Sequence, residues 1–343
     1  MAVRFGLIGC GVVSPTHAAA LNGIEGVQLA AAADTSQERL DEFTAEFGIP
    51  RSYTDYRRLL DDPSVDAVCV CSPHFLHAPM AIEAAEAGKH VLVEKPMATS
   101  LEDADRLIQV CGERGVLLGA VLQHRFDPAA IYVKRLIDEG LLGIVTLASV
   151  FVRWFREADY YDPNSWRGSK EKAGGGVLIN QAIHALDVLC WAMGGAVSVT
   201  GYCTARAYDI EVEDTAAAAL RFANGAIGIV EASTAAYPQT EERIEISGTL
   251  GTVVIEGERV FTRGLKNAPP LPEVEEESRF QGKSYYGRSH PRALEDFAAA
   301  VAEGRPPKVD GAEGRKVLET IFAIYESSRL GGRETPILGG AVK

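Results

Sequence analysis

The stretch VRFGLIGCGVVS, residues Val3–Ser14, decides the fold of the N-terminal part of the chain. An apolar run, Val3–Ile8, leads directly into a G-x-G-x-x-S turn. Two glycines allow a tight turn and let the backbone approach a pyrophosphate, whose charge then lies at a helix N-terminus. The small Ser14 still permits close packing of that helix on the strand. The stretch predicts a dinucleotide-binding turn whose ligand contacts come from Gly9, Gly11, Val12 and Val13.

An acidic residue follows the second apolar run, Val27–Ala33. Asp34 lies 23 residues after Gly11, close to the spacing expected for the residue that binds the ribose hydroxyls. A carboxylate repels a 2′-phosphate, residues 35–38 contain no arginine, and Arg39 is expected one helical turn too far along. NAD is therefore expected rather than NADP, with Asp34 and Thr35 as cofactor residues. The alternative is that Asp34 merely caps a helix.

The first third of the chain alternates short apolar runs with amphipathic stretches. Continuous apolar runs indicate strands buried on both faces, and strands that alternate with helices indicate a parallel sheet. We predict a Rossmann dinucleotide-binding domain over residues 1–123. Its further strands are expected at Val65–Val70, His90–Val93 and Val116–Leu122, and its helices at Ser36–Phe47, Ala78–Ala87 and Ser100–Arg114, with Ser36 and Ser100 as N-caps.

The pattern changes from about Val145. Two hairpins are indicated, Ala216–Phe222 with Ala226–Glu231, and Arg243–Ser247 with Thr252–Glu256. We predict that residues 124–343 form an α+β domain with a large, mainly antiparallel, open-faced sheet. The expected helices are Pro128–Glu139, Val177–Met193, Arg292–Glu303 and Ala312–Arg329.

Composition narrows the function classes. The 343 residues carry 34 Lys and Arg against 47 Asp and Glu, a formal net charge of −13. An acidic surface disfavours nucleic acid and anionic membranes as partners. The six cysteines lack the spacing of a zinc site or a disulfide framework, and the N-terminus does not resemble a signal peptide. We expect reduced cysteines, no metal and a cytoplasmic location.

Two loops of the predicted Rossmann domain carry reactive side chains. The fourth strand ends in Glu94-Lys95-Pro96, at the edge where open α/β sheets bind ligands. A lysine there can exchange a proton with a hydroxyl or a carbonyl, although it could also be a surface lysine that closes a strand. The loop after the third strand is expected to face the cofactor with Ser72, Pro73, His74 and His77.

A second cluster follows three glycines, Gly174–Gly176. If Val177–Met193 is one helix, Asn180, His184 and Asp187 share a face of it. Buried polar groups need partners, and the glycines would allow close approach to a ligand. The alternative is a core histidine that is satisfied and capped by Asp187.

Together these features resemble the glucose–fructose oxidoreductase, inositol dehydrogenase and rhizopine-catabolism (Gfo/Idh/MocA) family. The resemblance rests on the glycine turn, Asp34, the Glu-Lys-Pro motif, the Ser165–Gly168 segment and the block from Gly174 to Asp187. It covers essentially the whole chain.

The resemblance implies a role for each matching residue. Lys95 matches the catalytic lysine, Pro96 a proline joined by a cis bond, and His184 the histidine general acid/base. Asn180 stands where many members carry aspartate, and an amide cannot relay a proton. Further expected contacts are Glu94, Gln123, Trp166 and Arg167 for the cofactor, and Lys95, Arg125, Asn180 and His184 for the substrate.

The implied activity is an NAD-dependent dehydrogenase that oxidises a hydroxyl of a monosaccharide, an anhydrosugar, an inositol or a nucleotide sugar. Two alternatives stay open, a redox-neutral enzyme that retains NAD and a non-enzymatic NAD-binding regulator. The family also implies a homodimer or homotetramer formed through the C-terminal sheet, which would cover an apolar sheet face.

Overall fold

The computed structural model describes residues 2–273 and 288–337, which form two compact units. Residues 2–123 and 288–315 make up the first unit, and residues 124–273 and 316–337 the second. The chain thus returns to the first unit with helix α10 (His290–Glu303). This helix packs on the first strand, where the rings of Phe297 and Phe5 meet edge-to-face with centroids 6.3 Å apart. Sequence reasoning had grouped this helix with the second half of the chain.

The first unit is built on a six-stranded sheet of order β3-β2-β1-β4-β5-β6 in which every pair is parallel. This order reverses direction between β1 and β4, the position where doubly wound folds bind dinucleotides. The Rossmann prediction is confirmed. The strands are β1 (Val3–Ile8), β2 (Val27–Ala33), β3 (Ser52–Tyr53), β4 (Ala67–Val70), β5 (His90–Val93) and β6 (Leu118–Ala120).

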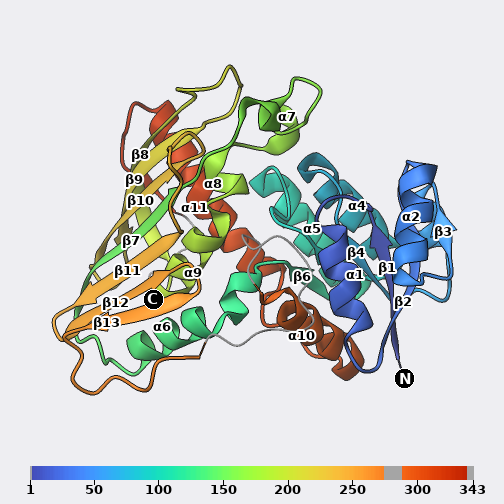
Figure 1. The fold of residues 1–343 in the computed structure, drawn as a ribbon, viewed down its shortest axis with the longest axis horizontal. Helices are drawn as coiled ribbons and strands as arrows, with labels where there is room; N and C mark the ends of the chain where they lie inside the picture. Colours follow the sequence, from blue (N-terminus) through green and yellow to red (C-terminus); the bar gives the residue numbers. More distant parts are fainter. Residues whose placement is uncertain (1, 274–287, 338–343) are drawn as a thin grey trace. The chain divides into compact units, whose positions relative to one another are not determined.

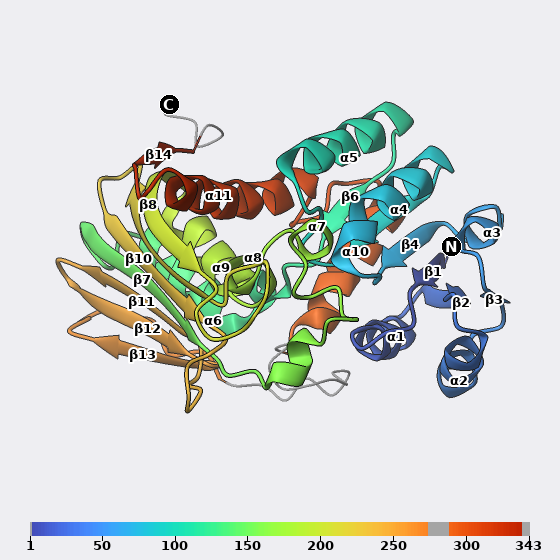
Figure 2. The same cartoon turned by 90° about the horizontal axis from the view of Figure 1, so that it is seen from above.

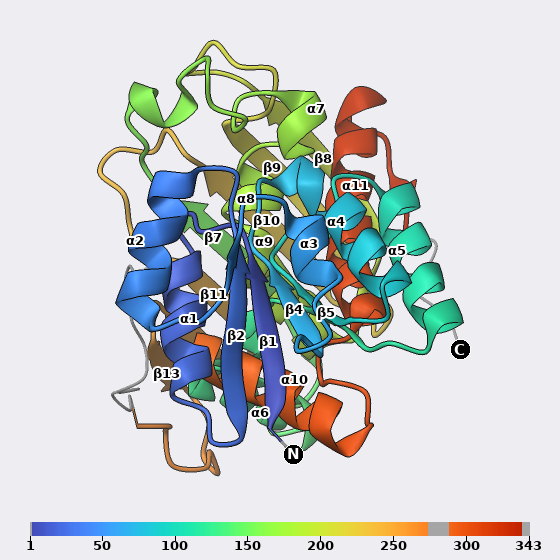
Figure 3. The same ribbon diagram turned by 90° about the vertical axis from the view of Figure 1, so that its right-hand side faces the viewer.

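Helices cover both faces of this sheet. Figure 3 shows α1 and α2 on one side of the strands and α4 and α5 on the other. Ser36 and Ser100 cap two of these helices as predicted, because their hydroxyls accept the backbone N–H of Arg39 and Asp103. The helices are α1 (Ser14–Asn22), α2 (Gln37–Phe47), α3 (Tyr56–Leu60), α4 (His74–Glu86) and α5 (Leu101–Arg114).

Some boundaries differ from those expected. Helix α4 begins at His74, four residues earlier than predicted, because Pro73 supplies an extended N-cap. The strands β4 and β6 are shorter than the predicted apolar runs, because residues 65–66 precede β4 and residues 116–117 and 121–122 flank β6. The short β3 and α3 had escaped prediction because neither has enough residues to show a period.

The second unit contains an eight-stranded sheet of order β13-β12-β11-β7-β10-β9-β8-β14. Its pairs are antiparallel except β7 with β10, so the mainly antiparallel sheet is confirmed. Both predicted hairpins form. The strands are β7 (Val145–Arg153), β8 (Ala196–Thr204), β9 (Thr215–Phe222), β10 (Ile227–Ser233), β11 (Arg243–Gly248), β12 (Gly251–Glu256), β13 (Arg259–Arg263) and β14 (Thr335–Pro336).

Helices of the described chain cover one face of this second sheet (Figures 1 and 2). Burial alternates along β9 and β10, as expected for strands with one face on a core and one face exposed. Residues of α11 from 316 onward belong to this unit. The helical elements are η1 (Gln123–Phe126), α6 (Pro128–Asp138), η2 (Ala158–Tyr161), α7 (Lys170–Ala173), α8 (Val177–Asn180), α9 (Ile183–Met193) and α11 (Gly311–Arg329).

The single helix predicted over Val177–Met193 is wrong, because the segment breaks into α8 and α9. At the break, the N–H of Ala182 donates to the carbonyl of Val177 at 2.8 Å, five residues back, which makes the turn one residue wider than an α-helical turn. Asn180 therefore ends one helix and His184 lies in the first turn of the next. Asn180 therefore does not share a helix face with the other two, whereas His184 and Asp187 are three positions apart on α9 and share one.

Among residues 2–273 and 288–337, no single helix is long and apolar enough to cross a bilayer. The bent pair 170–180 and 183–193 passes by length and composition alone, and α9 is largely buried within its unit.

Candidate active site

The glycine turn after β1 leaves room on one side. Gly9 has a left-handed φ of +94°, and a Cβ there would lie 2.8 Å from the carbonyl oxygen of Cys71. The packing of the chain itself therefore requires this glycine. A Cβ at Gly11 would meet nothing within 4 Å, and the adjacent Val12 is 60% exposed. The backbone at Gly11 is thus open to a ligand, as the sequence predicted, and Val13 follows as the residue before α1.

Asp34 braces this turn. Its carboxylate accepts the N–H of Cys10 at 2.8 Å and the N–H of Ser36 at 2.9 Å. The side chain is largely buried, so its charge stays close to the turn, whereas Thr35 beside it is exposed. The expectation that Arg39 lies too far along is wrong, because its guanidinium reaches to 3.5 Å from the Asp34 carboxylate.

The loop between β4 and α4 presents one unsatisfied polar atom. The hydroxyl of Ser72 is buried and has no hydrogen-bond partner among the described residues. His74 is buried in the first turn of α4 after Pro73. The ring nitrogens of His77 lie 2.7 Å from the carbonyl of Pro96 and 2.6 Å from that of Ser72. The His77 ring thus holds two loops together, and its contact with the cofactor stays a prediction.

The backbone around Lys95 is fixed on both sides. Its N–H donates to a carboxylate oxygen of Glu94 at 3.0 Å, and the Lys95–Pro96 bond is cis, as the family resemblance implied. The Pro96 carbonyl is held by His77. Burial lowers the pKa of His77, so the neutral ring donates to one of its two carbonyls at a time. Lys95 thus extends from a rigid base at the carboxyl end of β5.

These features fit a dinucleotide. The open backbone at Gly11 and the first turn of α1 suit a diphosphate, the Asp34 carboxylate suits ribose hydroxyls, and the unpartnered Ser72 hydroxyl can serve a bound group. All of them lie at the carboxyl edge of the first sheet, around the switch between β1 and β4.

In the second unit, two of the three glycines serve the packing of the chain, and Gly174 ends α7 with a left-handed φ of 79°. A Cβ at Gly176 would lie 1.8 Å from the carbonyl oxygen of Glu213, and one at Gly175 would lie 2.2 Å from the hydroxyl of Tyr325. The Glu213 carboxylate accepts the N–H groups of Gly176 and Leu178 at 2.8 and 3.0 Å, which caps α8. The close approach that the glycines were expected to offer a ligand is made here by Glu213 and Tyr325.

Asn180 is anchored through a tyrosine. The Tyr160 hydroxyl accepts hydrogen bonds from the amide of Asn180 at 3.1 Å and from the amide of Gln181 at 3.0 Å. The guanidinium of Arg167 lies over the rings of Tyr160 and Trp166, at 4.9 and 5.0 Å from their centroids. Trp166 and Arg167 therefore belong to the loop that holds the end of α8.

His184 stacks on a second histidine. The rings of His184 and His124 are 4.8 Å apart between centroids with 23° between their planes. His124 lies 3.1 Å from the carboxylate of Asp127. Burial disfavours the His124 cation, but Asp127, Glu242 and Asp187 outweigh this effect and raise the pKa of His124 to about 9. A positive charge therefore lies beside His184 at neutral pH.

The carboxylate of Asp187 pairs with an arginine. It receives two hydrogen bonds from the guanidinium of Arg125, at 2.8 and 2.6 Å, and both side chains are buried. This pair ties α9 to η1, which also contains the buried Gln123. The guanidinium of Arg125 was predicted to contact the substrate. In the structure it binds Asp187, and a contact with the substrate stays a prediction.

Sequence reasoning missed several residues around these groups. His17 and His290 flank Glu94 in the first unit, and Tyr160 and His124 flank Asn180 and His184 in the second. For His17 there was a signal, since it lies on the first helix three residues after Ser14. The other three partners lie far from their targets in sequence or beside no motif.

The comparisons with known proteins cover both units. The sequence model of an oxidoreductase family with an NAD-binding Rossmann fold, GFO/IDH/MocA, matches residues 3–121. The model of the GFO/IDH/MocA C-terminal domain matches residues 131–254. The chain belongs to the GFO/IDH/MocA family.

Members of this family resemble the chain over nearly its whole length. Myo-inositol 2-dehydrogenase of Thermotoga maritima is 30% identical, over 95% of this chain and 96% of that protein. The WlbA dehydrogenase from Bordetella pertussis, solved with NADH and UDP-GlcNAcA, is 36% identical with a TM-score of 0.89, covering 98% of this chain and 97% of that one. A levoglucosan dehydrogenase in complex with NADH is 27% identical with a TM-score of 0.88, covering 98% and 99%. The chain is an NAD-dependent oxidoreductase.

Proposed function

We propose that this GFO/IDH/MocA enzyme oxidises a ring hydroxyl of a sugar or cyclic polyol. The observation that carries the proposal is Lys95, which extends from a doubly fixed backbone at the carboxyl end of β5. The named relatives support the substrate class, since one acts on myo-inositol, one is a levoglucosan dehydrogenase and one was solved with UDP-GlcNAcA. NAD, when bound, supplies the nicotinamide that accepts the hydride.

Each proposed residue has a distinct task. The Lys95 ammonium donates a hydrogen bond to the reacting oxygen and stabilises the negative charge that develops there. The His184 imidazole accepts the hydroxyl proton as general base. An amide cannot relay a proton, so Asn180 is assigned the task of orienting the substrate. Its amide donates to the Tyr160 hydroxyl, which holds it in place. Arg125 keeps its predicted place at the substrate side, although its guanidinium already pairs with Asp187.

Two substitutions test this assignment. Lys95→Ala should lower turnover of an active sugar or polyol by about 100-fold or more, within the range of general acid–base contributions. NAD binding, measured by calorimetry, should change little. Lys89→Met is the control, because Lys89 lies at the opposite end of β5 and donates to the carbonyls of Asp62 and Val65. Full activity of Lys95→Ala would refute the assignment. Tightly retained NAD without net reduction would instead favour the redox-neutral alternative.

We also propose that the exposed face of the second sheet binds a second copy of this chain. Apolar side chains that are about half exposed or more lie along neighbouring strands of that face, at Leu147, Tyr202, Ile227 and Ile229. An exposed apolar patch of this kind is a common subunit interface. Light scattering at micromolar concentration should give a dimer or a tetramer. Ile229→Lys should shift the mass toward the monomer, and a monomeric wild type would refute the proposal.

The proposed location is the cytoplasm. All six cysteines are free, and five of them are buried, as expected for a protein kept in a reducing compartment.

A further inference from the structure

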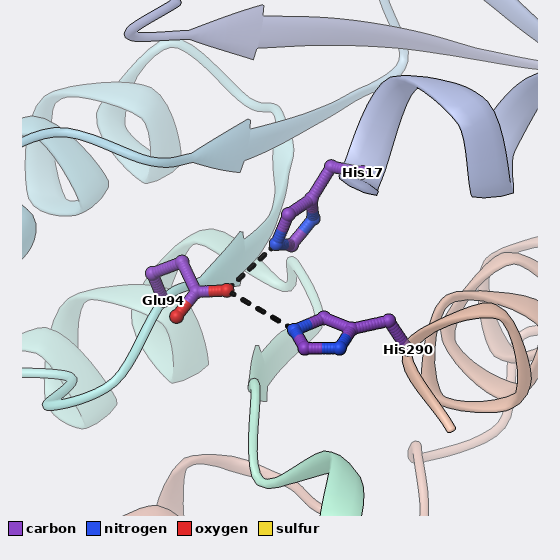
Figure 4. A group of neighbouring side chains, drawn as sticks. All are labelled: His17, Glu94 and His290. Atoms are coloured by element: carbon purple, nitrogen blue, oxygen red, sulfur yellow. Dashed lines mark hydrogen bonds and ion pairs between the residues drawn. The ribbon is translucent and has the colours of Figure 1, made fainter. Parts of the chain in front are cut away.

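A buried charged cluster contains Glu94, the residue that precedes Lys95. Glu94 follows β5, His17 comes from α1 and His290 from the first turn of α10, and all three side chains belong to the first unit (Figure 4). The Nε2 atom of His17 lies 2.6 Å from Oε1 of Glu94, and Nε2 of His290 lies 3.9 Å from the same oxygen. Each of the three residues is at most 6% exposed. The cluster is part of the interior of the unit.

Glu94 uses its two oxygens for different partners. Oε1 receives the hydrogen bond from His17, and Oε2 accepts the backbone N–H of Lys95 at 3.0 Å. Burial of a carboxylate is costly unless both oxygens are paired. The same side chain therefore links helix α1, which follows the glycine turn, to the backbone of Lys95.

The pair carries opposite charges at neutral pH. Burial alone would raise the pKa of Glu94, but His17, His290 and Lys95 lower it to about 2. Burial disfavours the His17 cation, yet Cys71 and Glu94 raise the pKa of His17 to about 10. Within residues 2–273 and 288–337, the titratable groups that face Glu94 from the surrounding elements are His17, Cys69, Cys71, His77, Lys95 and His290.

The spacing of the cluster is that of a hydrogen-bonded ion pair. Two imidazoles and a carboxylate could also be the ligands of a zinc ion. Tetrahedral ligands with bonds of about 2.0–2.1 Å lie about 3.3 Å apart, however. The 2.6 Å between His17 and Glu94 leaves room for a proton between the two atoms and none for a metal ion.

We propose that His17, acting through Glu94, is a positioning residue for Lys95. The inference rests on the proposed catalytic role of Lys95. The positive charge of His17 keeps the Glu94 carboxylate ionised. The ionised carboxylate accepts the backbone N–H of Lys95 and so fixes the backbone from which the Lys95 side chain extends. The cluster also joins the dinucleotide-binding helix to the catalytic strand end through a single hydrogen-bonded chain.

Hydrogen exchange of the Lys95 amide tests this inference without a substrate. The full-length protein with NAD is compared as wild type, His17→Gln, Glu94→Gln and the control Lys89→Met, with the intrinsic rate divided out at each pH. In His17→Gln we expect the protection of the Lys95 amide to fall by about 10-fold, the value of one charge-assisted hydrogen bond. As the pH is lowered, the protection of the Lys95 amide should also be lost at a higher pH in His17→Gln than in wild type, because Glu94 protonates more readily without the His17 cation.

The variants distinguish positioning from general stabilisation. In Glu94→Gln the protection should be low and independent of pH between pH 3 and 7, because the titrating carboxylate is gone. Lys89→Met loses two buried hydrogen bonds of the same unit and should leave the Lys95 amide as protected as in wild type. Circular dichroism establishes whether each variant is folded. If His17→Gln does not fold, the pH dependence of the Lys95 amide protection in Glu94→Gln tests the inference instead.

Turnover adds a second readout. With an active sugar or polyol, His17→Gln should lower kcat by about 10-fold or more, since misplacing a catalytic group by 1 Å costs on the order of 100-fold. The KM for NAD should change much less. Wild-type protection and pH midpoint in His17→Gln, or the same losses in Lys89→Met, would overturn the inference. One equivalent of zinc bound by wild type but not by His17→Gln would also overturn it and would make the cluster a metal site. If instead Lys95→Ala stays fully active, the proposed function fails while the exchange result still stands.

Discussion

The buried pair between Arg125 and Asp187 makes a quantitative prediction about the second unit. Its two hydrogen bonds measure 2.8 and 2.6 Å, and the side chains are only 6% and 1% exposed. Removing one partner takes two short hydrogen bonds and the opposite charge away from the buried charge that is left, which costs about 3–5 kcal/mol. Arg125→Met and Asp187→Leu should each lower the free energy of unfolding by that amount.

The double variant should behave differently. Leucine has about the shape of aspartate, and methionine fills much of the volume of the arginine stem, so the double variant removes both charges of the pair. Replacing a whole buried ion pair with apolar groups is often neutral or stabilising. We expect the double variant to lie within about 1 kcal/mol of wild type, far less than the sum of the two single changes.

Tryptophan fluorescence during urea unfolding measures these values. All three tryptophans, Trp154, Trp166 and Trp191, belong to the second unit, so the signal reports on the unit that contains the pair. The Arg125 guanidinium itself lies 5.7 Å from the centre of the Trp191 ring. Single variants that cost less than about 1 kcal/mol, or a double variant as costly as the sum, would refute the reasoning.

Three further predictions concern other parts of the chain. Gly176→Ala should cost about 3 kcal/mol or more in urea unfolding, because its Cβ would lie 1.8 Å from the Glu213 carbonyl oxygen, whereas Gly112→Ala meets nothing within 4 Å and should stabilise the protein slightly. His17 contributes its full stability below its ordinary pKa of 6.5 and loses it as the pH rises toward about 10, and Glu94 contributes fully above 4.5 and loses it as the pH falls toward about 2. The stability gap between wild type and His17→Gln, measured by circular dichroism, should therefore be widest near pH 5–6 and narrow toward pH 9, and a gap that widens with pH would contradict the charge assignment. Asp34→Ser should improve NADP affinity relative to NAD by about 10-fold in calorimetry, because the repelling carboxylate is gone and Arg39 is released to pair with the 2′-phosphate; an unchanged ratio would count against this reading of the turn.

Local patterns were sufficient to predict four of the parallel strands of the first unit. The apolar runs of β1, β2, β4 and β5 are buried on both faces, and this burial is visible in sequence as continuous hydrophobicity. The placement of Lys95 followed from the same logic, since a residue after a parallel strand lies at the ligand-binding edge.

The second unit required information that is remote in sequence. The residues at the break between α8 and α9 include the polar Asn180 and Gln181 but no proline or glycine, so no helix-breaking residue marks the break in the sequence. It depends on Glu213, which caps α8, and on Tyr160, which holds the amides of Asn180 and Gln181. Arg125 and Asp187 are 62 positions apart, and no local period relates them.

Local patterns also could not predict the buried cluster of His17, Glu94 and His290, because its members are remote in sequence. Glu94 was chosen for its place in the Glu-Lys-Pro motif, but its partner His17 is 77 positions away along the chain. His290 comes from α10, which the sequence had grouped with the second half. Only the return of the chain to the first unit brings His290 close to Glu94.

The most direct test of the central claim is the formation of reduced nicotinamide by the purified protein. NAD and NADP are supplied separately, with aldoses, anhydrosugars, inositols and nucleotide sugars as substrates, and absorbance is followed in the near ultraviolet. We predict that NAD is reduced with at least one of these classes, that NADP is reduced more slowly, and that Lys95→Ala abolishes the signal while Lys89→Met keeps it. Equal rates for Lys95→Ala and wild type would contradict the account.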